Sequence, residues 1–188
     1  MSMLSSSVNA VPKKQVHFIS QRDAECLSPI PGAAMISITD PDKSEARLGN
    51  WDFLYRDSFY DGGYSENTIN TMKGAFRLKY ASYIDSKQAQ DMVDYLAKLV
   101  DRGVSQVYVH CYFGVSRSGA IAMYLRDNYG FVENKEITKP NLTVLRLLQD
   151  PQRYEALIQG FEPMPVVART SFHQKVLAAI LAAVRFKG

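Results

Sequence analysis

The segment from His110 to Ser118 (His-Cys-Tyr-Phe-Gly-Val-Ser-Arg-Ser) contains the residues of this chain that are best suited to catalysis. A cysteine reacts as its thiolate, and the thiol pKa of about 8.5 falls to roughly 3.5–7.5 beside cations or a helix N-terminus. Arg117 follows Cys111 with five residues between them. Its planar guanidinium can hold two phosphoryl oxygens at once. The pair therefore predicts a cysteine nucleophile that attacks a bound phosphoryl group.

The residues between the cysteine and the arginine fit a loop that binds an anion. Gly114 allows backbone dihedral angles that other residues avoid, and Ser116 is small. We expect a strand over 104–111 before the loop and a helix over 118–129 after it. Backbone N–H groups and the positive end of that helix would then converge on a tetrahedral oxyanion, and they would also favour the thiolate.

Other residues of the segment are expected to support this reaction. Ser118 can donate a hydrogen bond to the sulfur, which would make the sulfur a better leaving group in a second step. His110 is expected to orient the loop through its ring nitrogens rather than to transfer protons. The residues predicted to bind the phosphate are Tyr112, Phe113, Gly114, Val115, Ser116 and Arg117.

The elements that must position this loop are expected to alternate between strands and helices. Apolar and β-branched runs predict strands at 15–20, 33–38, 51–59 and 104–111, and helical spacing predicts helices at 85–103, 118–129, 140–148, 154–158 and 172–186. Residues 62–84 mix polar and apolar types and predict either a short hairpin or an excursion over the active site. Since helices dominate late in the chain, we expect an α/β fold with a helical C-terminal half.

Length and composition favour one domain with its own core. The chain has 188 residues, of which 46% are hydrophobic, and a net charge of +3, so it can bury a core without disulfides. We expect a phosphatase domain over 14–162, a flexible tail over 1–13, and a C-terminal helix over 163–188 packed on the same domain. The mild positive charge fits an anionic ligand, and no Lys/Arg run marks a nucleic-acid face.

Cysteine usage and hydropathy give an expected location. The two cysteines, Cys26 and Cys111, make no disulfide framework, and the three histidines match no zinc-ligand spacing. A reactive thiol favours a reducing compartment. The N-terminus lacks the blocks of a signal peptide, and no apolar run reaches the ~18 residues of a membrane span. We therefore expect a cytoplasmic monomer with no membrane span and no nucleic-acid partner.

The segment 110–118 resembles the HCxxGxxRS signature of the protein tyrosine and dual-specificity phosphatase superfamily. The fixed positions that match are His110, Cys111, Gly114, Arg117 and Ser118. The resemblance extends more loosely over 33–148 and is strongest to the compact bacterial and phage enzymes, which share a Pro-Asn start to a later helix like Pro140-Asn141. It implies a central mixed, mostly parallel sheet flanked by helices, a phosphocysteine intermediate, and no metal or other cofactor.

In this superfamily an aspartic acid on a nearby loop protonates the leaving group and then activates the hydrolytic water. The candidates are Asp57, Asp61 and Asp85. Asp61 is favoured, because it follows a predicted strand beside Gly62-Gly63, where the resemblance places the acid. Asp57 would lie within that strand, and Asp85 is explained as the N-cap of the next helix. The chain lacks the Trp-Pro-Asp loop of the larger classical tyrosine phosphatases, and residues 64–84 separate Asp61 from that helix.

The expected substrate is a phosphorylated protein side chain. Arg117 is the only cation in the loop, whereas enzymes for inositides or RNA 5′ ends benefit from further Lys or Arg. Phosphotyrosine is favoured, with phosphoserine and phosphothreonine as further candidates. Tyr112 and Phe113 predict either an aromatic wall for a phosphotyrosine ring or packing in the core beneath the loop. The rival functions are an inositide or RNA 5′-phosphatase, an inactive phosphate-binding module, and a sulfur- or arsenate-handling enzyme that uses Cys26.

Overall fold

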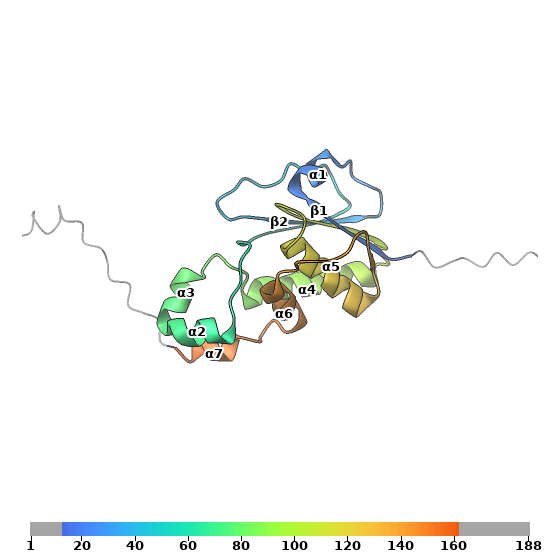
Figure 1. Ribbon diagram of the computed structural model, residues 1–188. Coiled ribbons are helices and arrows are strands. Elements are labelled where there is room, and N and C mark those ends of the chain that lie inside the picture. Colours follow the sequence, from blue (N-terminus) through green and yellow to red (C-terminus); the bar gives the residue numbers. More distant parts are fainter. Residues whose placement is uncertain (1–12, 162–188) are drawn as a thin grey trace, which may run out of the picture.

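A computed structural model of the chain describes residues 13–161 (Figure 1). Five strands form one sheet in the order β3-β2-β4-β1-β5, and every pair of neighbours is parallel. The strands are β1 (Gln15–Ser20), β2 (Ala34–Thr39), β3 (Phe53–Ser58), β4 (Gln106–Cys111) and β5 (Val132–Glu133). The helices are α1 (Gln21–Cys26), α2 (Glu66–Met72), η1 (Lys73–Ala75, a 3₁₀ helix), α3 (Phe76–Lys79), α4 (Ser86–Asp101), α5 (Arg117–Tyr129), α6 (Leu142–Gln149) and α7 (Glu155–Gln159). The predicted α/β class is confirmed.

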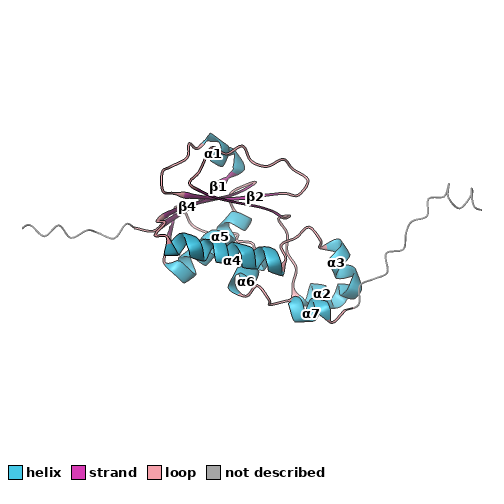
Figure 2. Cartoon of the chain, turned by 180° about the vertical axis from the view of Figure 1, so that it is seen from behind, coloured by secondary structure: helices cyan, strands magenta, loops and turns pink. Residues whose placement is uncertain are grey.

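Helices cover both faces of the sheet. Figures 1 and 2 show α4, α5 and α6 on one face and α1 on the other. Side chains alternate along each strand, so Ile36 and Ile38 of β2 enter the core beneath the three helices, while Met35 packs with Ala24 and Trp51 on the α1 side. All six residues of β2 are buried as a result, as expected for a central strand of a parallel sheet.

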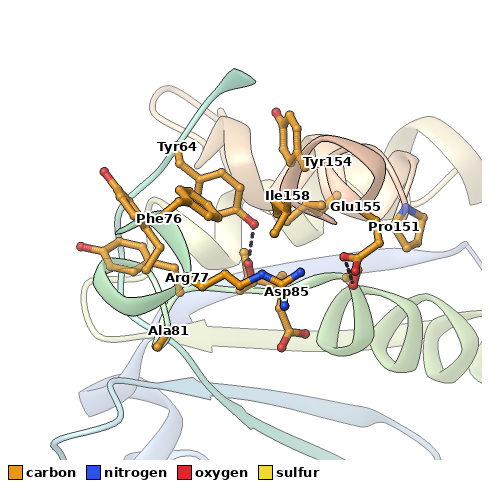
Figure 3. Close-up of a pocket in the computed structure, with 14 residues that line it drawn as sticks. Tyr64, Phe76, Arg77, Ala81, Asp85, Pro151, Tyr154, Glu155 and Ile158 are labelled. Atoms are coloured by element: carbon orange, nitrogen blue, oxygen red, sulfur yellow. Dashed lines mark hydrogen bonds between the residues drawn. The ribbon is translucent and has the colours of Figure 1, made fainter. Parts of the chain in front are cut away.

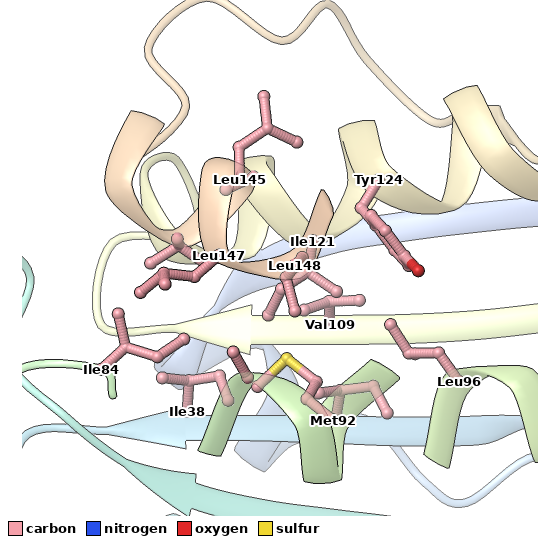
Figure 4. Packing of buried hydrophobic residues seen from close by; sticks show 14 of the residues in the cluster. Ile38, Ile84, Met92, Leu96, Val109, Ile121, Tyr124, Leu145, Leu147 and Leu148 are labelled. Carbon is pink, nitrogen blue, oxygen red and sulfur yellow. The ribbon is translucent and has the colours of Figure 1, made fainter. Parts of the chain in front are cut away.

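The larger core lies between the sheet and the layer of α4, α5 and α6. Figure 4 shows Met92 and Leu96 of α4 packed in one layer with Ile121 of α5 and Leu148 of α6, each at most 1% exposed. Burying an apolar side chain of this size stabilises a fold by roughly 1.5–3 kcal/mol. This layer therefore holds the helices rigidly against the strands whose ends carry the candidate site.

The segment between β3 and α4 is helical. The Ser65 hydroxyl accepts a hydrogen bond from the backbone N–H of Thr68, and the Thr68 hydroxyl accepts one from the backbone N–H of Ser65. This reciprocal capping starts α2, and η1 and α3 follow it. The hairpin alternative for 62–84 is therefore wrong. The expectation of a mixed sheet is also wrong for the described residues. All of their strand pairs are parallel, and none is antiparallel.

Other boundaries agree more closely with the sequence. Asp85 caps α4, accepting a hydrogen bond from the backbone N–H of Gln88 at 2.8 Å, and Gln88 accepts one in return. The short elements α1 and β5 were not predicted. The helix expected at 172–186 and residues 1–12 of the tail expected at 1–13 lie outside the described residues. Within 13–161, the structure has no helix that is long and apolar enough to cross a membrane.

Candidate active site

The predicted strand–loop–helix unit is present. β4 ends at Cys111 and α5 begins at Arg117, with residues 112–116 as the loop between them. Cys111 pairs in register with Ser20, the last residue of β1, so it lies at the edge of the sheet where the parallel strands end. Ligands of open α/β sheets bind at this edge. The 13-residue helix α5 directs its positive N-terminal end toward the same place.

The Cys111 thiol lies within a group of hydrogen-bond donors. Its sulfur is 3.3 Å from the Ser118 hydroxyl oxygen. Burial alone would raise the pKa of the Cys111 thiol. Hydrogen bonds from the Ser118 hydroxyl and from the backbone N–H groups of Ser118 and Val115, together with the charge of Arg117, outweigh burial and hold the pKa below its ordinary value. The site therefore favours the nucleophilic thiolate.

The thiol is nevertheless well covered. Cys111 is 1% exposed, whereas the next two residues, Tyr112 and Phe113, are 54% and 73% exposed. Their rings contact each other edge to face, with centroids 4.8 Å apart. Any molecule that reacts with the sulfur must therefore enter the loop to reach it. The exposure of the two rings contradicts the alternative that they pack in the core beneath the loop.

Gly114 is required by the path of this loop. Its φ of +69° is strained for residues with a side chain, and a Cβ at this position would overlap the backbone of Ile19 and Ser20. The carbonyl of Gly114 also accepts a hydrogen bond from Lys135 Nζ at 3.2 Å. The loop is therefore pressed against the junction of β1 and α1, which fixes its curvature.

The nitrogens of the Arg117 guanidinium have different surroundings. Nη1 lies 2.8 Å from Asp40 Oδ1 and donates hydrogen bonds to the carbonyl oxygens of Thr39 and Phe59. Nε is buried and has no hydrogen-bond partner within residues 13–161. It lies 3.9 Å from Asp61 Oδ2, beyond hydrogen-bonding distance. A buried guanidinium N–H without an acceptor is costly, and an oxyanion bound beside it would satisfy it.

Asp61 is brought into this site, as the sequence predicted. Its Oδ1 accepts hydrogen bonds from the Ser116 hydroxyl at 2.7 Å and from Asn141 Nδ2 at 3.0 Å. Asn141 also donates to the carbonyl of Gly62, and its side-chain oxygen caps α6. Both donors to the carboxylate bind Oδ1, and Oδ2 lies on the Arg117 side.

The other two acid candidates have structural contacts elsewhere. Asp85 is the N-cap of α4. Asp57 accepts hydrogen bonds at Oδ1 from Gln88 Nε2 and from the backbone N–H of Ser58, both at 2.7 Å. No contact with the cysteine loop is present for either residue, so Asp61 is the one candidate of the three that reaches Arg117.

His110 is fully buried on the α1 side of the sheet. Its Nε2 lies 2.8 Å from the Ser37 hydroxyl, and its Nδ1 has no hydrogen-bond partner among the described residues. Burial, followed by the positive charge of Arg56, lowers the pKa of His110 to about 4. The imidazole is therefore neutral at pH 7. A neutral, buried ring suits positioning of β4 and not proton transfer with a substrate.

Two residues of the site, Asp40 and Asn141, were not predicted from the sequence. Asp40 is the first residue after β2, and Asp61 lies three positions after the end of β3. A carboxylate that follows a predicted strand could therefore have indicated that Asp40 lies at the carboxyl edge of the sheet, near the site. Asn141 was recognised only as the start of a helix. Its contact with Asp61 joins positions 80 residues apart, and no local pattern encodes such a contact.

No family model, curated protein or solved structure matches the chain. Among residues 13–161, no three or more His, Cys, Asp or Glu side chains form a group that could hold a metal ion. Cys26 is an exposed free thiol, and Cys111 is a buried one.

Proposed function

We propose that this chain is a cysteine-dependent phosphatase that hydrolyses phosphotyrosine in proteins through a phosphocysteine intermediate. The observation that carries the proposal is that the nitrogens of the Arg117 guanidinium differ in their hydrogen-bond partners. Nη1 is occupied by Asp40 and two carbonyl oxygens, while the buried Nε has no acceptor in the part of the chain that the structure describes. A phosphoryl oxygen supplies that acceptor, beside a thiol whose pKa is lowered.

In the first step the Cys111 thiolate attacks phosphorus, and the bond between phosphorus and the phenolic oxygen of the substrate breaks. Arg117 and the loop N–H groups stabilise the charge on the equatorial oxygens of the transition state. The Asp61 carboxylic acid gives its proton from Oδ2 to the leaving phenolate. The products of this step are the dephosphorylated side chain, a phosphocysteine and the Asp61 carboxylate.

In the second step the Asp61 carboxylate accepts a proton from water as the water attacks phosphorus. The bond between sulfur and phosphorus breaks, inorganic phosphate leaves, and Cys111 returns to its thiolate. The Ser118 hydroxyl, 3.3 Å from the sulfur, stabilises the negative charge that forms there. The proton on Asp61 is then in place for the next cycle.

Preference for a phosphorylated protein side chain is supported by the surface beside the loop. The exposed rings of Tyr112 and Phe113 stand next to Cys111 and can contact an aromatic substrate ring. The loop itself offers one cation, Arg117, which suits one phosphoryl group better than a polyphosphorylated inositide or an RNA end.

The direct test is hydrolysis of p-nitrophenyl phosphate and of a phosphotyrosine peptide. We expect turnover by the wild-type chain and by Cys26→Ser, inhibition by vanadate, and no turnover by Cys111→Ser, which should still bind the peptide. Acid quenching during turnover should trap phosphate on Cys111. Unchanged activity of Cys111→Ser would refute the proposal, and tight peptide binding without turnover by the wild type would indicate a phosphate-binding module.

A further inference from the structure

The segment 134–141, between β5 and α6, lies against the cysteine loop. At its start, Asn134 is bonded to β1 twice, through its backbone N–H at 3.0 Å and through its side-chain oxygen at 3.1 Å. At its end, the backbone N–H of Asn141 donates to the carbonyl of Ser116 at 3.0 Å. The segment is therefore fixed to the sheet at one end and to the loop at the other.

Lys135 of this segment places an ammonium group on the loop. Its Nζ donates to the carbonyl oxygen of Gly114 at 3.2 Å and lies over the Phe18 ring, 4.6 Å from the centroid. Phe18 is 2% exposed, so its ring is a fixed surface for the cation. Lys135 forms no ion pair within residues 13–161. The Gly114 carbonyl is therefore the one hydrogen-bond acceptor of this ammonium among the described residues.

The carbonyl that Lys135 binds belongs to the same peptide group as the N–H of Val115. In a trans peptide group the C=O and N–H bonds point in opposite directions. The N–H of Val115 is one of the hydrogen-bond donors to the Cys111 sulfur. This peptide group therefore has the ammonium at its oxygen and the sulfur at its hydrogen. Because hydrogen bonds in a chain polarise one another, a cation at the oxygen makes the N–H a stronger donor.

We propose that Lys135 is a positioning residue for the Cys111 thiolate. Its ammonium holds the peptide group between Gly114 and Val115 with the N–H directed at the sulfur, and it strengthens that N–H as a donor. This effect on the thiolate does not depend on the molecule that Cys111 attacks. Its consequence for turnover rests on the proposed phosphatase function, because the thiolate is the attacking form.

The other charged groups of the site form a constant background to this effect. Arg117 also favours the thiolate, and Asp40 and Asp61 lie against its guanidinium. His110, which precedes the cysteine, is neutral at pH 7. These four side chains are the same in every protein compared in the test, so a difference between the proteins reports the residue that was changed.

The test measures the Cys111 thiolate directly. In the full chain carrying Cys26→Ser, the rate of alkylation by iodoacetamide, a neutral reagent, is followed against pH. Lys135→Met keeps the length of the side chain and removes its charge, and we expect it to raise the midpoint by about half a pH unit. Lys135→Arg retains a cation that can reach the carbonyl, and it should restore the midpoint of the parent.

Two controls separate this contact from a general loss of positive charge. Lys139→Met removes an exposed cation from the same segment. Arg77→Met removes one from the wall of an aromatic cavity that no residue of the cysteine loop borders (Figure 3). Both should leave the midpoint unchanged. A midpoint that does not rise in Lys135→Met, or that rises equally in the controls, would overturn the proposal.

Turnover distinguishes this role of Lys135 from the proposed function. With p-nitrophenyl phosphate, the acid limb of the kcat/KM profile should move to higher pH in Lys135→Met by the same amount as the alkylation midpoint, because kcat/KM follows ionisations of the free enzyme. A lower kcat/KM with an unchanged midpoint would overturn the positioning role. If no phosphorylated compound is hydrolysed but the midpoint still depends on Lys135, the proposed function fails and the role of Lys135 stands.

Discussion

The Asp40 carboxylate anchors the Arg117 guanidinium, with Oδ1 of Asp40 2.8 Å from Nη1 of Arg117. The arginine side chain is 2% exposed and the aspartate side chain 23% exposed, so solvent screens this pair only in part. Asp40 leaves the strand β2 at the same sheet edge at which Cys111 leaves β4. The ion pair therefore fixes the guanidinium in place, and in the proposed reaction such preorganisation is the main requirement for stabilising a transition-state charge.

Replacing this anchor is expected to reduce catalysis without removing the nucleophile. In Asp40→Asn the guanidinium loses a charged acceptor, and we expect kcat/KM for p-nitrophenyl phosphate to fall by roughly 10- to 100-fold. The matched control is Asp42→Asn, because Asp42 is exposed and its one ion pair within residues 13–161 is with Lys43. Steady-state kinetics of the two variants check the prediction. An equal effect of both changes would show that Asp40 acts through general charge and not through Arg117.

The sequence predicted the positions of the loop residues better than the residues that support the loop. Cys111, Gly114, Arg117 and Ser118 lie within nine residues, where spacing, glycine flexibility and a following helix can be recognised locally. The supports come from distant segments. Asp40 reaches Arg117 only because β2 is the neighbour of β4 in the sheet, and strand order is a tertiary property that local patterns do not encode.

Capping and tertiary contacts explain why residues 62–84 are helical, where a hairpin was one of the two structures predicted. Residues 62–84 show no clean hydrophobic period, so their sequence is compatible with a hairpin as well as with helices. The short helices there are started by the Ser65–Thr68 capping box and are held by contacts among aromatic rings, such as those of Tyr64 with Phe76 and Tyr154. These contacts join residues up to 90 positions apart, so the stabilising partner of each helix lies outside any local window.

The hydrogen bond between Ser118 and the sulfur should be visible in the thiol pKa. In a Cys26→Ser background, alkylation by iodoacetate reports the thiolate fraction of Cys111. We expect the midpoint of its pH profile to lie below the ordinary thiol value of about 8.5, and to rise in Ser118→Ala, because that change removes a donor to the sulfur.

Ser116→Ala is the matched control for that measurement, since the Ser116 hydroxyl donates to Asp61 and not to the sulfur. Its alkylation midpoint should stay close to that of the parent. Vanadate should protect the thiol in all three proteins. A Cys111 that is not alkylated at any pH up to 9 would mean that its burial closes the site to substrates.

The leaving group should determine the effect of removing Asp61. Phenyl phosphate releases a basic phenolate that needs a proton, whereas the leaving group of p-nitrophenyl phosphate is stable without one. We expect Asp61→Asn to lower kcat by roughly 10²–10⁴-fold with phenyl phosphate and far less with p-nitrophenyl phosphate. Asp57→Asn, whose carboxylate contacts Gln88 and Ser58, should change neither rate much. Equal losses with both substrates for Asp61→Asn would exclude it as the general acid.

His110 should make the stability of the fold depend on acid pH. Its pKa is about 4 in the folded chain because of burial and the nearby positive charge of Arg56, and near 6.5 in an unfolded chain. Between these values the unfolded state binds a proton that the folded state does not. The contribution of His110 to stability is therefore fully present above pH 6.5 and is lost as the pH falls toward 4, by about 3 kcal/mol in total.

Two measurements check this dependence. Urea unfolding at pH 7, 6, 5 and 4.5 should give a falling free energy of unfolding. The fall should be shallower in His110→Gln, because glutamine can keep the hydrogen bond to Ser37 but does not titrate. In the wild type, NMR titration of the His110 ring should show a neutral imidazole at pH 5, a result that does not require the variant to fold. A ring already half protonated near pH 6.5 would show that it is not sealed from water, and the predicted difference between the two proteins would then vanish.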